Sequence, residues 1–148
     1  MGKEASIEIN CSRYSKDIIK VIDLFLEIGW KVSDTDDRIT YLPIGDKGDY
    51  AWECGLISLD DLREVIKNKQ SLQETIGLVL YYKKTGHGIT VLAKDTEEFF
   101  FGLDINRKTY DTSRESITDI GWYFCNTVNR MVENGCPIDH IKFQEYTD

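Results

Sequence analysis

The chain has 148 residues, of which 41% are hydrophobic and 11% aromatic, and it contains 11 glycines and 2 prolines. This composition excludes collagen-like and disordered chains and fits one compact domain, and no apolar run reaches the length of about 18 residues that a membrane-spanning helix needs. The 26 acidic and 18 basic residues give a formal net charge of −8, which disfavours nucleic acid and anionic membranes as partners and favours a basic protein. No signal-peptide pattern opens the chain, so we expect a cytoplasmic location.

The first part of the chain predicts a strand, a helix and several short strands. Residues 6–11 alternate between polar and apolar side chains, as in a half-buried strand. A helix with its N-cap at Ser15 is predicted to run to Ile28 and to end at Gly29, because its apolar residues share one face. Residues 30–58 predict two or three strands joined by acidic turns.

The middle of the chain predicts a second helix and an antiparallel meander. Ser58 and Asp61 form a capping-box pattern for a helix that runs to about residue 69. Residues 75–82 form an apolar run that is typical of a central strand covered on both faces. Tight turns at 85–88 and 94–97 then lead into two more strands, which gives a three-stranded meander.

The last part predicts a long helix and a final strand. Thr112 and Glu115 form a second capping-box pattern, for a helix that ends at Gly135, and residues 140–146 alternate as a strand. No repeat or linker divides the chain. We therefore predict an α+β fold in a single domain over residues 1–148, with a mostly antiparallel sheet, a central meander and three helices.

The chain lacks the common catalytic signatures, such as phosphate-binding glycine loops, zinc-protease motifs and nucleophile elbows. Of its two histidines, His87 lies between glycines in a turn, where a solvated position is expected, and His140 opens the last strand. The four cysteines follow no metal-binding spacing: Cys11, Cys54, Cys125 and Cys136. We therefore predict no catalytic residue, no metal site and no cofactor.

Two turns rich in aspartate are the clearest candidates for a functional site. One turn contains Asp34, Asp36 and Asp37, and the next contains Asp46 and Asp49. If the flanking strands pair, these carboxylates converge and offer oxygen ligands to a hard cation, although the spacing is not that of an EF-hand. The alternative is that they are ordinary solvated turn residues.

Aromatic side chains flank the two acidic turns. They are Trp30, Tyr41, Tyr50 and Trp52, with Glu53 adjacent to the last. Tyrosine and tryptophan inside an acidic rim are typical of protein interfaces. The alternative is that the tryptophans belong to the core of a small sheet.

Three more aromatic residues raise the same question. In the predicted third helix, Trp122 and Tyr123 lie outside the apolar stripe to which Ile117 belongs. In the predicted strand at 99–101, Phe100 points to the opposite side from its two neighbours. Either other elements of the fold cover these side chains, or they are available to a partner.

Three stretches of the chain are YLPIGD at 41–46, YAWE at 50–53 and ITDIGWY at 117–123. In a small acidic chain without catalytic motifs, they resemble bacterial immunity proteins of polymorphic-toxin and contact-dependent growth inhibition systems. The resemblance implies a non-enzymatic inhibitor that binds a cognate toxin domain tightly, and many such toxins are nucleases with basic clefts.

From charge and exposure we predict which residues bind such a partner, with carboxylates placed where phosphates would lie and aromatic side chains as anchors. They are Asp34, Asp36, Asp37, Asp46, Asp49, Tyr50, Trp52 and Glu53. Two alternatives stay open. A small-molecule site would be lined by Tyr81, Tyr82 and residues 99–101, and a metal-dependent hydrolase would use the acidic turns. Neither the partner's identity nor the oligomeric state follows from the sequence.

Overall fold

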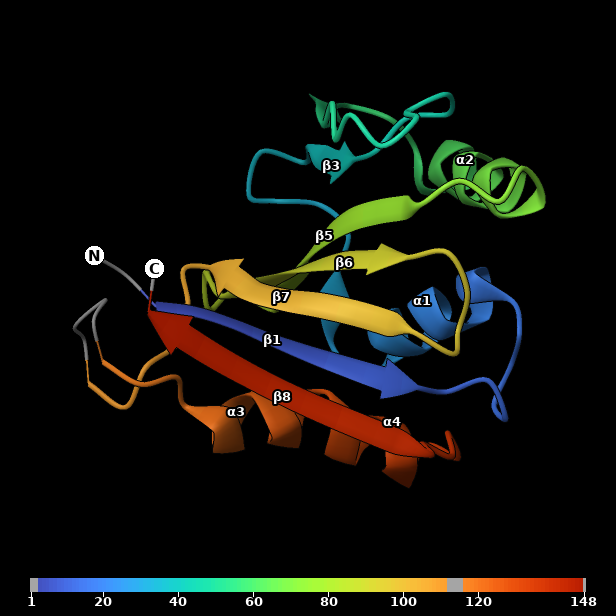
Figure 1. Cartoon of the computed structure of the whole chain (residues 1–148). Helices are drawn as coiled ribbons and strands as arrows, with labels where there is room; N and C mark the ends of the chain where they lie inside the picture. Colours follow the sequence, from blue (N-terminus) through green and yellow to red (C-terminus); the bar gives the residue numbers. More distant parts are fainter. Residues whose placement is uncertain (1–2, 112–115, 148) are drawn as a thin grey trace.

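The computed structural model describes residues 3–111 and 116–147. Eight strands form one sheet in the order β4-β3-β5-β6-β7-β1-β8, β2 also pairs with β5, and every pairing is antiparallel (Figure 1). The strands are β1 (Lys3–Asn10), β2 (Trp30–Lys31), β3 (Ile39–Tyr41), β4 (Glu53–Gly55), β5 (Ile76–Tyr82), β6 (Gly88–Ala93), β7 (Phe99–Ile105) and β8 (His140–Thr147). The helices are α1 (Ile18–Glu27), α2 (Leu59–Ser71), α3 (Ile120–Asn126) and α4 (Val128–Glu133). The predicted α+β fold with a central β5-β6-β7 meander is confirmed.

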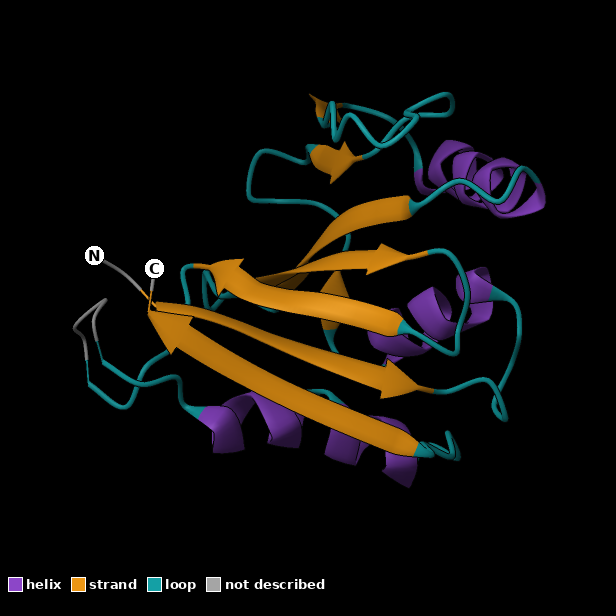
Figure 2. Ribbon diagram, in the orientation of Figure 1, coloured by secondary structure: helices purple, strands orange, loops and turns teal. Residues whose placement is uncertain are grey.

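The helices gather on one side of the sheet. In Figures 1 and 2, α1, α3 and α4 lie behind the strands and α2 lies beside β5, so that no helix of the described residues covers the front face. An antiparallel sheet tolerates this arrangement because its side chains alternate, with one apolar face and one more polar face. Alternation is clear in β1, where Ile7 and Ile9 are buried and Glu8 between them is not.

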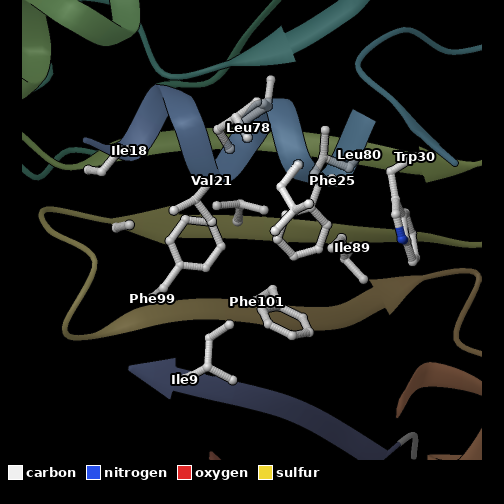
Figure 3. Close-up of a cluster of buried hydrophobic side chains, with 14 of the residues drawn as sticks. Ile9, Ile18, Val21, Phe25, Trp30, Leu78, Leu80, Ile89, Phe99 and Phe101 are labelled. Carbon is white, nitrogen blue, oxygen red and sulfur yellow. The ribbon is translucent and has the colours of Figure 1, made fainter. Parts of the chain in front are cut away.

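The core lies between α1 and the sheet (Figure 3). Phe25 of α1 stacks on Phe99 of β7 with ring centroids 5.8 Å apart and meets Phe101 edge-on at the same distance. Trp30 of β2 is 1% exposed, and its indole Nε1 donates a hydrogen bond to the carbonyl oxygen of Asn126 at 2.8 Å. This bond joins β2 to α3, so Trp30 is a core residue.

The helix starts follow the predicted capping chemistry in one case and depart from it in another. Ser58 caps α2 as predicted, since its side chain accepts a hydrogen bond from the amide of Asp61. The N-cap of α1 is Asp17 instead of Ser15, whose hydroxyl accepts a hydrogen bond from the amide of Asp17. The prediction for Ser15 was therefore wrong by two residues, because two cap-forming side chains, Ser15 and Asp17, compete for one helix start.

The third helical region is shorter than predicted and broken. Asp119 caps it at Ile120, and Thr127 interrupts it, with φ −125° and ψ −86° and its hydroxyl bonded to the carbonyl oxygen of Tyr123. The predicted cap at 112–115 lies outside the described residues. Because the helix begins only at Ile120, the predicted stripe is displaced: Tyr123 is fully buried, whereas Ile117 is 53% exposed.

Candidate functional site

The first acidic turn holds itself together. A carboxylate oxygen of Asp34 accepts hydrogen bonds from the amides of Asp36 and Arg38, at 2.8 and 3.0 Å. Asp36 and Asp37 are exposed, and Asp37 has a positive φ of 59°. The structure therefore gives Asp34 a role in forming the turn and leaves its two neighbours facing solvent.

The second acidic turn is organised by Asp46, which is buried. Its two carboxylate oxygens accept hydrogen bonds from the amides of Tyr50 and Ala51, at 3.2 and 2.9 Å. Asp49 and Tyr50 are exposed, and the Tyr50 ring keeps about half of its surface free. Asp46 therefore supports the loop, while Asp49 and Tyr50 are presented by it.

Trp52 and Glu53 follow this loop and have different surroundings. Trp52 is half-buried and lies over Gly77 of β5: a Cβ atom added to this glycine would fall 2.8 Å from the indole and 2.5 Å from Leu42. Glu53 is exposed and accepts a hydrogen bond from the Tyr41 hydroxyl at 3.1 Å. Burial, and then this carboxylate, raises the pKa of Tyr41.

A buried lysine fixes the base of the same loop. Lys69 of α2 is 1% exposed, and its ammonium donates a hydrogen bond to the carbonyl oxygen of Pro43 at 2.7 Å and lies 3.7 Å from Glu74. Glu74 also accepts a hydrogen bond from the amide of Gly45 at 2.8 Å. Burial lowers the pKa of Lys69, and the charges of Glu74 and Asp46 partly oppose that shift.

The two acidic turns do not build a cation site in the described part of the chain. No group of three or more histidine, cysteine, aspartate or glutamate side chains there has the arrangement to hold a metal ion. The oxygens of Asp34 and Asp46 already accept backbone hydrogen bonds. The two turns instead precede and follow β3 in the chain, and each presents exposed aspartates, Asp36 and Asp37 in the first and Asp49 in the second.

Large apolar side chains are exposed in and after the second acidic turn. Four large ones lie in the segment 44–59: Ile44, Tyr50, Leu56 and Leu59. Leu56 is 74% exposed, and several exposed apolar side chains in one short segment are more informative than a single exposed leucine. Sequence reasoning identified Tyr50 in this group but missed the leucines and Ile44.

A larger feature occupies the helix-free front of the sheet. A groove of about 690 Å³ runs over β1, β6, β7 and β8, and a second hollow of about 400 Å³ continues it past Leu92 and Phe100, which line both. We call this surface the open sheet face; its front-facing residues are Glu4, Ser6, Glu8, Thr90, Leu92, Phe100, Gly102, Asp104, Gln144 and Tyr146.

The strand register arranges this face in rows. One row crosses Leu92, Phe100 and Glu8 and ends at Lys142, and the next crosses Thr90, Gly102, Ser6 and Gln144. Leu92 also pairs with Gly77, the glycine that lies under Trp52. The loop carrying Asp46, Asp49 and Tyr50 therefore borders the same side of the sheet.

The charge around the two hollows is mainly negative. Their linings contain five carboxylates, Glu4, Glu8, Asp95, Glu98 and Asp104, and three basic side chains, Lys3, Lys94 and Arg107. The Arg107 guanidinium is mostly buried and lies 3.4 Å from Glu145, so its charge is already compensated. An apolar centre with a mainly acidic rim is the result.

Phe100 answers one question left open by the sequence, because it is half-buried on a face that no described helix covers. The predicted small-molecule site does not form as one lining: Tyr82, Phe99 and Phe101 are buried in the core, whereas Phe100 faces the front. Period-two alternation along residues 99–101 was the signal that could have located the open sheet face.

The aromatic residues of α3 are covered by the fold. Trp122 is half-buried, and its indole meets Tyr82, Tyr123 and His87 with ring centroids 5.5, 4.9 and 5.2 Å apart. Nδ1 of His87 also lies 2.5 Å from the carbonyl oxygen of Asn106. The solvated position expected for His87 is met only in part, because its ring is half-buried against Trp122 of α3, while residues 83–86 of the turn are exposed.

Comparison with family models, curated proteins and solved structures finds no match to this chain. Among the described residues, no helix combines the length and the apolar composition needed to cross a membrane.

Proposed function

We propose that this chain is a non-enzymatic acidic binding protein that neutralises a cognate toxin by forming a tight complex and blocking its active site or substrate cleft. The observation that carries the proposal is the open sheet face, where Leu92 and Phe100 form an apolar centre within a mainly acidic rim. Interfaces of this kind use desolvated apolar anchors for affinity and surrounding charges for orientation.

The charge of the whole chain supports a basic partner. A formal net charge of −8 attracts a cationic surface over a distance of about one Debye length and speeds the encounter of the two proteins. The exposed aspartates of the two acidic turns, Asp36, Asp37 and Asp49, add to this field, and Asp49 precedes the Tyr50 anchor directly in the chain. The toxin as partner rests on the resemblance of residues 41–46, 50–53 and 117–123 to immunity proteins.

The second acidic turn and the open sheet face suit a single large partner. The loop that presents Asp49 and Tyr50 is fixed by Asp46 and Lys69, so little conformational entropy is lost when it is bound. A partner that covers both Tyr50 and Phe100 would bridge the side of the sheet that Trp52 borders. Blocking a cleft requires such an extended contact.

The test is capture of partners from a lysate of the native source, at low and at high salt, with mass spectrometry of the bound proteins. We expect one basic protein near one-to-one ratio, partly released by salt. A Phe100→Asp variant should lose it, whereas Leu72→Asp, which changes an exposed leucine at the end of α2, should keep it. Recovery of no basic protein from a source that expresses toxin domains would contradict the proposal.

A further inference from the structure

We propose that the open sheet face contains a receptor pocket for an arginine side chain of the partner, centred at Gly102 and bordered at one end by Glu4 and Asp104. The inference deepens the proposed function, because it rests on the partner being a basic protein and names the side chain that its surface must present. It follows from the shape of the groove and from the two carboxylates on its walls.

The hollow arises because Gly102 has no side chain. A Cβ atom added there would meet nothing nearer than the Asp104 carboxyl group, at 3.7 Å, which is an ordinary van der Waals distance. Its neighbours across the sheet are Thr90 of β6 and Ser6 of β1, both short polar residues. Phe100, two residues along β7, supplies the aromatic wall. The groove beside Gly102 is therefore partly apolar, with the Asp104 carboxyl group in van der Waals contact at its edge.

Two carboxylates reach this hollow from neighbouring strands. The register that pairs Ser6 with Gly102 brings Glu4 of β1 and Asp104 of β7 to the same end of the groove, which both line. Neighbouring strands lie about 4.8 Å apart, so the two groups approach from adjacent positions.

Each carboxylate is held in place by one hydroxyl group. Oδ1 of Asp104 accepts a hydrogen bond from Thr90 at 2.8 Å, and Oε2 of Glu4 accepts one from Tyr146 at 2.6 Å. Among the described residues, Asp104 Oδ2 and Glu4 Oε1 accept no hydrogen bond. The hydroxyls orient both groups without neutralising either charge, which prepares them for a cation.

The two basic side chains in the same groove are engaged elsewhere. The Lys3 ammonium donates a hydrogen bond to the Thr147 hydroxyl at 3.2 Å. The Arg107 guanidinium donates to Thr118 at 2.8 Å and lies 3.4 Å from Glu145. Neither contact is with Glu4 or Asp104, so the two carboxylates are left to a cation from outside.

Arginine fits this site better than lysine does. Its planar guanidinium presents five N–H donors in a fork, which can contact two carboxylates at once, and its flat face stacks on an aromatic ring such as Phe100. A lysine ammonium is a compact, strongly hydrated point charge without such a face. The groove of about 690 Å³ leaves room for the arginine stem.

The test is an NMR titration of the ¹⁵N-labelled protein with N-acetyl-arginine methylamide, and with the citrulline analogue as a neutral isostere. We expect arginine to shift the amide signals of Ser6, Gly102 and Asp104, and the citrulline analogue to leave them in place. Gly102→Leu fills the groove at its centre, and Asp104→Asn removes one exposed charge, so each should weaken binding, the second by about two- to fivefold. Gly121→Leu adds the same bulk at an exposed position of α3 and should bind as the parent does.

Shifts scattered over the acidic surface, equal shifts with the citrulline analogue, or undiminished binding by both Gly102→Leu and Asp104→Asn would overturn the pocket. Unchanged remaining signals in each variant establish that it is folded. Failure of the arginine titration while a basic partner is still captured refutes the pocket alone. Binding of arginine at Gly102 without capture of any basic partner supports the pocket and counts against the toxin-neutralising function.

Discussion

The ammonium of Lys69 and the carbonyl oxygen of Pro43 lie 2.7 Å apart, with Lys69 almost fully buried. This bond links the C-terminal end of α2 to the start of the loop that carries Asp46, Asp49 and Tyr50. Because the charge is removed from water, its hydrogen bond and the Glu74 carboxylate 3.7 Å away must together offset the cost of burial.

Lys69→Met should therefore destabilise the protein. The substitution leaves the Pro43 carbonyl and the Glu74 carboxylate without their cation, and we expect a loss of about 1–3 kcal/mol in the free energy of unfolding. Urea denaturation measures it. Lys67→Met, which changes an exposed lysine of the same helix, should stay within about 0.5 kcal/mol of the parent. Equal stability of the two variants would contradict the role given to Lys69.

The contribution of Lys69 should also depend on pH. Burial lowers its pKa in the folded protein below the ordinary value of 10.5, so between these two values the unfolded chain binds more protons than the folded one. The stability that Lys69 contributes should then rise with pH across that window. The raised pKa of Tyr41 acts in the opposite direction, but it is shared by the parent and Lys69→Met and cancels in their difference. A difference that falls as the pH approaches 10.5 would show that the sign is wrong.

Gly77 should accept no side chain. A Cβ atom there would fall 2.5 Å from Leu42 and 2.8 Å from Trp52, so Gly77→Ala forces these two residues off the sheet, at a cost of about 1–3 kcal/mol. Urea denaturation and a change in tryptophan fluorescence report the two effects. Gly55→Ala, where an added Cβ meets nothing within 4 Å, is the matched control and should change neither.

The exposed aspartates should matter for binding and not for stability. Replacing Asp36, Asp37 and Asp49 together by lysine should change the free energy of unfolding by about 0.5 kcal/mol or less at Asp36 and Asp49, because exposed turn charges contribute little. At Asp37 the cost should be larger, because its positive φ favours aspartate over lysine. Affinity for the captured partner and its salt dependence should both fall.

Replacing Glu27, Glu64 and Glu133 by lysine makes the same change of net charge away from the acidic turns, because these three glutamates are exposed on the helices. This control should have the smaller effect. Isothermal titration at two salt concentrations compares the variants. Equal losses in both triple variants would assign the effect to net charge alone.

Thiol labelling should divide the four free cysteines into two reactive and two unreactive residues. Cys54 and Cys125 are exposed, whereas Cys11 and Cys136 are buried, and the hydrogen bond with Cys136, followed by burial, raises the pKa of Cys11. We expect iodoacetamide to modify Cys54 and Cys125 in the folded protein and the other two only after unfolding. Mass spectrometry of the labelled peptides gives the result, and rapid modification of Cys11 in the native protein would contradict the packing described.

Periodicity and turn chemistry predicted most of this fold. The alternation in β1, the cap at Ser58 and the apolar run of β5 each depend on neighbouring residues, and the structure confirms them. The break at Thr127 was missed because it depends on a side chain bonding to its own helix. The apolar periodicity of a helix does not show which hydroxyl side chain will bond to a carbonyl oxygen of that helix and interrupt it.

The candidate site was only partly predictable. The acidic turns were visible as composition, but the hydrogen bonds that give Asp34 and Asp46 structural roles depend on the loop geometry. The open sheet face exists because the helices cover only the other face of the sheet. Alternation in the sequence shows that a strand has two different faces, but it does not show which of them the helices cover. Phe100 marked the surface, yet only the packing of α1 against Phe99 and Phe101 shows that Phe100 lies on the opposite, uncovered side.

The most direct measurement is a titration of the captured partner's toxic activity with this protein. The proposed function predicts that activity falls linearly and is abolished near one equivalent, and that Phe100→Asp shifts the titration to a large excess while the protein remains folded. Full activity of the partner in the presence of saturating protein would contradict the account, because the complex would then form without blocking anything.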